Sequence, residues 1–180
     1  AIHKENVKEK AQELYNMLKD KYRMEIDLRE QVSPGYKFNY WEMKGVPIRI
    51  EIGPRDIENG ECIIVRRDTS EKITVSLDEL ENKIKELLDK IHINMFNTCK
   101  KRMEDKTMVA HNLDEFQEIM SKEQGFIKAM WCGSSECEAK IKELTYATSR
   151  CIPFEQEHIS DTCVCCGKKA DKMVIWGRQY

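Results

Sequence analysis

Six of the eight cysteines lie between residue 132 and the end of the chain, with a spacing typical of a metal site. Those that could chelate form two groups: Cys132-x4-Cys137 and, 26 positions later, Cys163-Val164-Cys165-Cys166-Gly167. Tetrahedral zinc takes four thiolates at ~2.3 Å, and a close pair from each of two turns can supply them. Gly167 allows a tight turn, and the N-terminus of a helix predicted between Cys132 and Cys137 would stabilise a thiolate. The sequence therefore predicts a zinc ion held by this module.

The fourth zinc ligand has two candidates. Cys163, Cys165 and Cys166 cannot all bind a four-coordinate zinc that also holds Cys132 and Cys137. A gap of two residues is usual in a zinc knuckle, which favours Cys163 with Cys166 and makes Cys165 a spare thiol. The predicted ligands are thus Cys132, Cys137, Cys163 and Cys166, with Cys165 or Cys166 left open as the fourth.

Two other residues could be zinc ligands, and the cysteines could also have a role other than metal binding. Cys151 falls in a predicted strand, and His158 merely lies nearby in the sequence. A disulfide framework or buried free thiols could also explain the cysteines, but the N-terminus carries no secretion signal, and disulfides are rare in the cytoplasm. Because four thiolates leave no open coordination position, we expect a structural metal rather than a catalytic one.

A second group of residues with chemical potential lies between Gly35 and Asp56. We predict a loop that holds four aromatic residues: Tyr36, Phe38, Tyr40 and Trp41. Beside it stand four charged residues: Glu42, Arg49, Arg55 and Asp56. Aromatic rings and planar charged groups can stack on and hydrogen-bond to unpaired bases. By spacing alone, a solvated face with aromatics packed beneath it is the better explanation of the stretch.

The elements that must position these residues are a mixture of helices and strands. In the first part we predict a helix over 5–20 and strands over 23–28, 47–53, 62–66 and 72–75, with Arg49 projecting away from the core. Ser76 and Glu79 form a capping box that starts a long helix over 77–104, with an apolar stripe that includes Met95, Cys99 and Met103.

A second module is predicted after this long helix. Asn112 and Glu115 form another capping box before a short helix, followed by a strand over 126–131, a helix over 135–146, and strands over 150–154 and 173–176. The change in cysteine content and the fresh helix start predict two domains, 1–105 and 106–180.

Composition excludes several classes of protein. The chain has 180 residues, 41% of them hydrophobic, and a net charge of −2, which is neither a disordered nor a collagen-like profile. Balanced charge argues against non-specific binding to nucleic acid, so any such contact should be local. No apolar run approaches the ~20 residues that a membrane helix requires. We therefore expect no membrane partner and a cytoplasmic location.

The run Gly45-Val46-Pro47-Ile48-Arg49-Ile50-Glu51-Ile52-Gly53-Pro54-Arg55-Asp56, with Val65-Arg66-Arg67-Asp68-Thr69 after it, resembles the anticodon-binding domain of class II aminoacyl-tRNA synthetases. The later motifs Trp131-Cys132-Gly133, Cys151-Ile152-Pro153-Phe154, the cysteine-rich knuckle and Gly177-Arg178-Gln179-Tyr180 are similar only to prolyl-tRNA synthetases of the archaeal and eukaryotic type. The resemblance implies an α/β fold: an anticodon-binding domain with a mixed sheet flanked by helices, joined by a long helix to a small α+β zinc-binding domain. It also implies a first strand of the sheet that is mostly missing from this sequence, with Ala1-Ile2 as its last residues.

The resemblance assigns roles to particular residues. It implies that Glu42, Arg49, Arg55 and Asp56 read the two guanines shared by proline anticodons, with Phe38 as a stacking partner. Arginine can donate in a fork to guanine O6 and N7, and a carboxylate can accept from the Watson–Crick edge. The resemblance further implies that the terminal carboxylate of Tyr180 is directed towards the catalytic domain.

The aminoacylation motifs of class II enzymes are absent from this sequence, so no residue here is expected to be catalytic. The resemblance then implies the C-terminal part of a proline–tRNA ligase whose proline, ATP and Mg²⁺ sites lie in a separate catalytic domain. The expected partners are proline tRNA, that catalytic domain and, through it, a second copy in a homodimer. The rival hypothesis is a zinc-stabilised module that binds protein partners and has no synthetase function.

Overall fold

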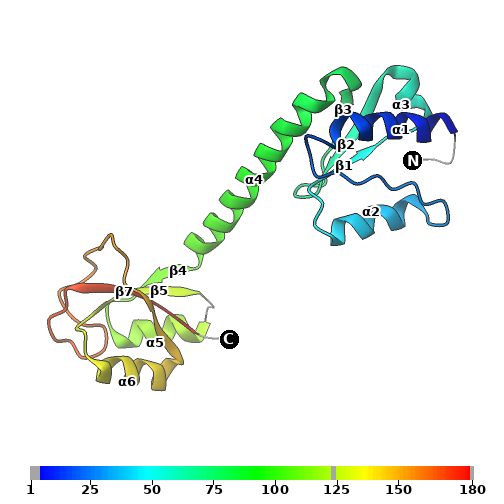
Figure 1. The fold of residues 1–180 in the computed structure, drawn as a ribbon. Helices are drawn as coiled ribbons and strands as arrows, with labels where there is room; N and C mark the ends of the chain where they lie inside the picture. Colours follow the sequence, from blue (N-terminus) through cyan, green and yellow to red (C-terminus); the bar gives the residue numbers. More distant parts are fainter. Residues whose placement is uncertain (1–4, 123–124, 179–180) are drawn as a thin grey trace. The chain divides into compact units, whose positions relative to one another are not determined.

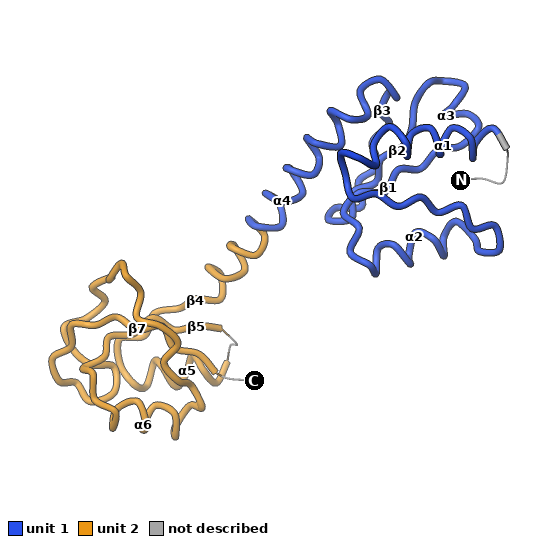
Figure 2. Tube along the Cα trace, viewed as in Figure 1, with its two compact units in different colours: residues 1–97 blue, residues 98–180 orange. Residues whose placement is uncertain are grey.

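The computed structural model describes residues 5–122 and 125–178, which form two compact units, 1–97 and 98–180, shown in Figure 2. The two units meet within one continuous helix, α4 (Leu80–Asp105), drawn in green in Figure 1. The first unit ends at Asn97, whereas the first predicted domain ends eight residues later, at 105. Among the described residues, no helix is both long and apolar enough to cross a membrane.

The first unit is built on an antiparallel sheet in the order β1 (Ile48–Glu51), β2 (Glu61–Arg66), β3 (Lys72–Ser76). Apolar residues of β1 and β2 alternate to one face, where α1 (Glu5–Leu18) and the start of α4 cover them. The fully buried core residues there include Leu18, Ile64, Leu80 and Leu87. Arg49 lies on the opposite face of β1, as the alternation predicts.

Two predictions for the first unit are wrong. The aromatic stretch is a helix, α2 (Pro34–Met43), because the Ser33 side chain caps its first turn by accepting from the Tyr36 N–H and Pro34 fits the first helical position. Residues 23–26 alternate in exposure as a strand would, but 27 and 28 do not continue the pattern, and the backbone of 23–28 pairs with no strand among the described residues. A short helix, α3 (Pro54–Asn59), was also not expected after β1.

The long helix begins differently from the prediction. Ser76 accepts from the N–H of Asp78 at 3.4 Å, and not from Glu79, because a 3₁₀ turn, η1 (Leu77–Glu79), precedes α4. Leu80, Ile84, Leu87 and Ile91 of α4 are buried, in agreement with the predicted stripe. Later members of the stripe, such as Met95 and Met103, are about half exposed, so the stripe does not extend the core.

The second unit contains a mixed sheet in the order β4 (Thr107–Val109), β5 (Phe126–Trp131), β7 (Lys172–Arg178), β6 (Ala147–Cys151). Strands β4 and β5 are parallel and the other pairs are antiparallel. Both α5 (Leu113–Lys122) and α6 (Ser135–Thr145) lie on one face of this sheet (Figure 1). Trp176, fully buried, makes edge contacts with Phe116 and Trp131 at the centre of the core.

The sequence predicted this unit more accurately. The cap at Asn112 is confirmed, since Asn112 Oδ1 accepts from the Glu115 N–H at 2.9 Å. The return bond of the predicted capping box differs, because the Glu115 carboxylate accepts from the His111 N–H at 2.9 Å. The helix and strand expected over 135–146 and 126–131 are also confirmed. The strand expected over 150–154 is displaced to Ala147–Cys151, because Tyr146 takes a left-handed conformation that ends α6 and lets the chain return at once along β7. Strand β4 was not expected.

Candidate functional site

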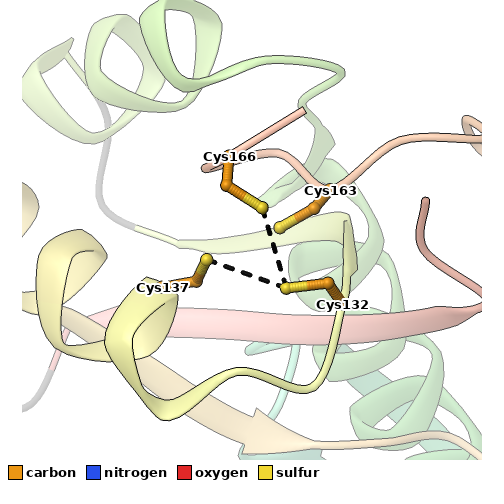
Figure 3. Close-up of side chains that lie close together, drawn as sticks. All are labelled: Cys132, Cys137, Cys163 and Cys166. Carbon is orange, nitrogen blue, oxygen red and sulfur yellow. Dashed lines mark hydrogen bonds between the residues drawn. The ribbon is translucent and has the colours of Figure 1, made fainter. Parts of the chain in front are cut away.

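Four cysteines meet at one point of the second unit. The sulfur atoms of Cys132, Cys137, Cys163 and Cys166 all lie within 4.8 Å of one another, and their side chains converge in Figure 3. Cys132 Sγ is 3.7 Å from Cys137 Sγ and 3.8 Å from Cys166 Sγ. Two thiolates bound at ~2.3 Å to a tetrahedral zinc lie about 3.8 Å apart. The donor set and its spacing therefore fit zinc, and they are too wide for a disulfide, in which S–S is about 2.05 Å.

The first cysteine pair is positioned by the junction between β5 and α6. Cys132 follows the last residue of β5, and Gly133 then takes a left-handed conformation, with φ of 86°, that reverses the chain. The Ser134 side chain caps α6 by accepting from the Glu136 N–H, so Cys137 lies in the first helical turn. The amide groups of that turn give a positive field at the sulfur.

The second pair lies on the cysteine hairpin, which we define as residues 162–169. The Cys163 N–H donates to Lys168 O at 2.7 Å, and the Gly167 N–H donates to Cys163 O at 3.0 Å. Gly167 has φ of 69°, which confirms that the turn needs the glycine. The Val164 N–H donates to Met130 O at 2.9 Å, which joins the hairpin to β5 beside Cys132.

The surroundings of the thiols separate the ligand candidates. Cys165 is not a member of the metal-ligand cluster and packs against two apolar core clusters, one of which contains Cys137 and Cys163. The N–H of Lys168 donates to Cys166 and lowers the pKa of that thiol to about 7, whereas burial raises the pKa of Cys137. Cys151 is exposed on β6, and His158 pairs with Asp161 at 3.2 Å. Within residues 5–122 and 125–178 this is the one cluster of three or more potential metal ligands.

A second site lies on the first unit, where side chains of α2 contact Arg49 of β1. A small surface depression, called the hollow below, is lined by these residues: Phe38, Trp41, Glu42, Val46, Arg49, Val65, Arg66 and Arg67. Arg49 pairs in register with Val65 of β2, so the two form its floor. Three of the five residues predicted to contact RNA, Phe38, Glu42 and Arg49, therefore come together.

Arg49 is fixed in orientation on three sides. Its Nη1 donates to Glu42 Oε1 at 2.5 Å and its Nε donates to Glu51 Oε1 at 2.8 Å. The guanidinium carbon lies 4.1 Å above the centre of the Phe38 ring, a cation–π contact. The Arg49 side chain is 18% exposed and Glu42 is 48% exposed, so this pair faces solvent at the edge of the hollow. Sequence reasoning missed Glu51, although its position two residues after Arg49 on the same strand places both on one face.

Arg55 and Asp56 lie on α3 and do not line the hollow. Asp56 Oδ2 accepts from the Gly53 N–H at 2.7 Å, which caps the helix. The structure thus gives Asp56 a local structural contact that the sequence did not suggest, while Arg55 is exposed. Tyr180 lies outside the described residues.

A partly buried carboxylate, that of Asp27, holds α2 in place. Asp27 accepts from Trp41 Nε1 at 2.9 Å and from the Arg29 guanidinium at 2.6 and 2.9 Å. The Arg29 side chain, by donating to this carboxylate, holds the pKa of Asp27 well below its ordinary value. Lys37, which is 4% exposed, donates to Asp27 O at 3.3 Å. Because Trp41 and Lys37 belong to α2, these contacts fix the helix that presents Phe38 and Glu42.

Between residues 22–28 and β1 lies a groove of about 280 Å³. Its walls are mainly apolar and include Met24 and Ile26 on one side and Ile48 and Ile50 on the other. Strand β1 pairs only with β2 among the described residues, so its other edge faces this groove.

Comparison with known proteins matches part of each unit to a family model. Residues 1–87 match the family model "Anticodon binding domain", and residues 113–180 match the model "Prolyl-tRNA synthetase, C-terminal". An anticodon-binding domain followed by this second domain defines the class of protein: the chain is part of an aminoacyl-tRNA synthetase.

The relatives narrow the class to one family. The chain is 55% identical over 180 residues to a proline–tRNA ligase of Clostridium botulinum (strain Okra / Type B1) and 52% identical to that of Alkaliphilus oremlandii (strain OhILAs). It is similar to the crystal structure of prolyl-tRNA synthetase from Cryptosporidium parvum complexed with L-proline and AMP, with a TM-score of 0.92 and 34% identity. In each case all of this chain is covered, but only 37 or 38% of the relative. Along its whole length the chain matches the C-terminal part of prolyl-tRNA synthetases, and its first part matches the anticodon-binding domain.

Proposed function

We propose that this chain supplies tRNA selection and structural support to a proline–tRNA ligase. In the complete enzyme, a catalytic domain would use ATP and Mg²⁺ to attach proline to its tRNA. The partners would be proline tRNA, that catalytic domain and a second copy in a homodimer, all in the cytoplasm. The observation that supports this most directly is the hollow, where Arg49, Glu42 and Phe38 meet on an anticodon-binding domain.

The chemistry of the hollow suits the two guanines of a proline anticodon. The Arg49 guanidinium has a fork of donors that matches O6 and N7 of guanine, and the Glu42 carboxylate can accept from N1–H and the N2 amine. Glu51 and Phe38 hold the fork in place before RNA arrives, so less side-chain entropy is lost on binding. Arg55 and the capped Asp56 would contact the RNA from α3. Selective binding energy would then position the acceptor end at the catalytic domain and raise specificity for the right tRNA.

We further propose that Cys132, Cys137, Cys163 and Cys166 hold a structural Zn²⁺. Zinc would cross-link the start of α6 to the cysteine hairpin, and four thiolates would leave no position for substrate. The separation of the sulfur atoms supports this proposal. The two-domain division at 105/106 is likewise proposed, with α4 as the connection.

The groove beside β1 is explained by the same proposal. We propose that a strand from a preceding part of the parent protein lies between β1 and residues 22–28. The edge of β1 would donate and accept its remaining backbone hydrogen bonds there, and Ile48 and Ile50 would bury apolar side chains of the added strand. This would complete the mixed sheet of an anticodon-binding domain.

The test compares two RNAs. Binding of the 180-residue chain is measured to a proline tRNA transcript and to the same transcript with both anticodon guanines replaced, at one moderate salt concentration. Phosphate contacts treat both RNAs alike, so a tenfold or greater loss, ~1.4 kcal/mol, on replacement identifies base recognition. Equal binding to both RNAs would refute guanine reading by this chain and favour the protein-interaction hypothesis.

A further inference from the structure

Arg67 occupies a different position in the hollow from the arginine proposed to contact bases. It follows the last residue of β2, where its backbone N–H donates to Pro47 O at 3.0 Å. Its side-chain Nε donates to the carbonyl oxygen of Glu42, near the end of α2, at 3.1 Å. The residue is exposed, so its guanidinium is anchored at one nitrogen while the group faces solvent beside the hollow.

The three arginines that line the hollow differ in their acidic partners. Arg49 pairs with Glu42 and Glu51. Arg66, whose side chain is 12% exposed, pairs with Asp68 at 2.7 Å and Glu71 at 3.2 Å. In the part of the chain that the structure describes, no carboxylate forms an ion pair with Arg67. The positive charge of the hollow is therefore least compensated at Arg67.

This difference predicts different ligands for the arginines. A guanidinium held between carboxylates is oriented for directed hydrogen bonds, but its charge is largely neutralised. An exposed guanidinium without an acidic partner attracts a phosphodiester, which is anionic and accepts two parallel hydrogen bonds. Phosphate contacts set the register of a nucleic acid on a protein and base contacts specify its sequence. Arg49 and Arg67 have the properties that these two tasks require.

We propose that Arg67 binds a backbone phosphate of the RNA whose bases enter the hollow, and that it positions the RNA without reading its sequence. This inference rests on the proposed function, because it takes an RNA in the hollow as given. Phosphate binding at Arg67 would also leave the Glu42 carbonyl contact at Nε intact, since the two terminal nitrogens can form the pair with phosphate oxygens.

A positioning role through α2 makes a different prediction. The bond from Arg67 Nε to Glu42 O lies at the C-terminal end of α2, where a cation also interacts favourably with the helix dipole. If that bond alone mattered, removing it would displace the Glu42 carboxylate and weaken guanine recognition. Loss of a phosphate contact instead weakens binding to every RNA equally and lowers the dependence on salt.

The experiment uses the 180-residue chain and the same two transcripts over a salt series from about 50 to 200 mM. Arg67→Gln removes the charge, Arg67→Met is a second neutral variant that keeps the aliphatic stem, and Arg67→Lys keeps the charge but not the fork. Arg49→Gln is the matched control from the same hollow. Thermal unfolding of each variant shows which of them are folded.

We expect both neutral Arg67 variants to bind each RNA about fivefold more weakly at low salt, with the slope of log K against log salt reduced by about 0.7 to 0.9, the value for one phosphate. Arg67→Lys should keep the wild-type slope. Arg49→Gln should lose affinity mainly for the transcript that contains the guanines.

Two results would overturn the inference. One is an unchanged slope for the neutral variants; the other is a loss confined to the guanine-containing transcript, which would assign Arg67 to positioning Glu42 or to base contact. Failure of the proposed function looks different: the wild-type chain would then bind both transcripts equally, whatever the Arg67 variants do.

Discussion

Replacing Cys137 by serine should remove one of the four thiolates proposed to hold zinc and so break the link between α6 and the cysteine hairpin. Cys137 and Cys163 are 26 positions apart in the sequence. A cross-link that closes a loop of this length lowers the entropy of the unfolded chain enough to stabilise the fold by about 3.5 kcal/mol. For a unit of this size, such a loss lowers the melting temperature by roughly 15 to 25 °C.

The matched control is Cys165→Ala. Cys165 lies on the same hairpin and packs against the core, but its sulfur is not a member of the cluster. This variant loses only one half-buried sulfur, so we expect it to keep one equivalent of zinc and to be destabilised by no more than about 1 kcal/mol. Cys137→Ser should retain less than half an equivalent.

The assay combines metal content with segment-resolved hydrogen exchange. Chelation of the wild-type chain, or Cys137→Ser, should accelerate exchange in β5, α6 and β7 and leave the first unit unchanged. If chelation leaves exchange in the second unit unaltered, or if Cys165→Ala loses metal while Cys137→Ser retains it, the zinc proposal or its ligand assignment is wrong.

Three further predictions concern single contacts. Arg49→Lys keeps the charge but loses the fork and the stacking on Phe38. The affinity for the proline tRNA transcript should therefore fall by about 1 to 3 kcal/mol, about 5- to 150-fold, with little change for the guanine-replaced transcript. Equal losses of affinity for both transcripts would contradict a base contact. Asp27→Asn weakens the contacts to Arg29 and Trp41, and denaturant unfolding should show a loss of about 1 to 3 kcal/mol in the first unit at neutral pH. Because folding lowers the pKa of Asp27, its contribution is complete above about pH 5 and lost as the pH falls below about 4; an unchanged acid-unfolding profile in the variant would refute this. Gly167→Ala has room for its methyl group, but an alanine at this positive φ should lower the free energy of unfolding by about 1 to 2 kcal/mol and weaken zinc binding. Gly35→Ala, in the first turn of α2, is the control at a position without a positive φ.

Local patterns in the sequence were sufficient to predict several features, because those features depend only on residues close together in the chain. Alternation placed Arg49 on the face of β1 opposite to Ile48 and Ile50, since successive side chains of a strand point to opposite sides. Short-range spacing favoured Cys163 and Cys166 over Cys165, and the structure brings that pair to Cys132 and Cys137. The cap at Asn112 likewise depends only on residues within one turn.

Other features were decided by contacts between distant residues. The alternation predicted the exposure of residues 23–26, but the prediction failed at Asp27, whose side chain accepts from Trp41 and Arg29. The segment is not a strand, because a strand exists only where a neighbour supplies hydrogen bonds. The helical state of the aromatic stretch depends on the Ser33 cap and on Lys37 and Trp41 reaching Asp27. Arg49, Arg66 and Arg67 differ in how far their charge is compensated. The fold brings carboxylates to Arg49 and Arg66, whereas no described carboxylate forms an ion pair with Arg67. The sequence therefore determined which side chains could act on RNA and metal, whereas the tertiary structure decided their partners, because charge compensation depends on distances that only the folded chain defines.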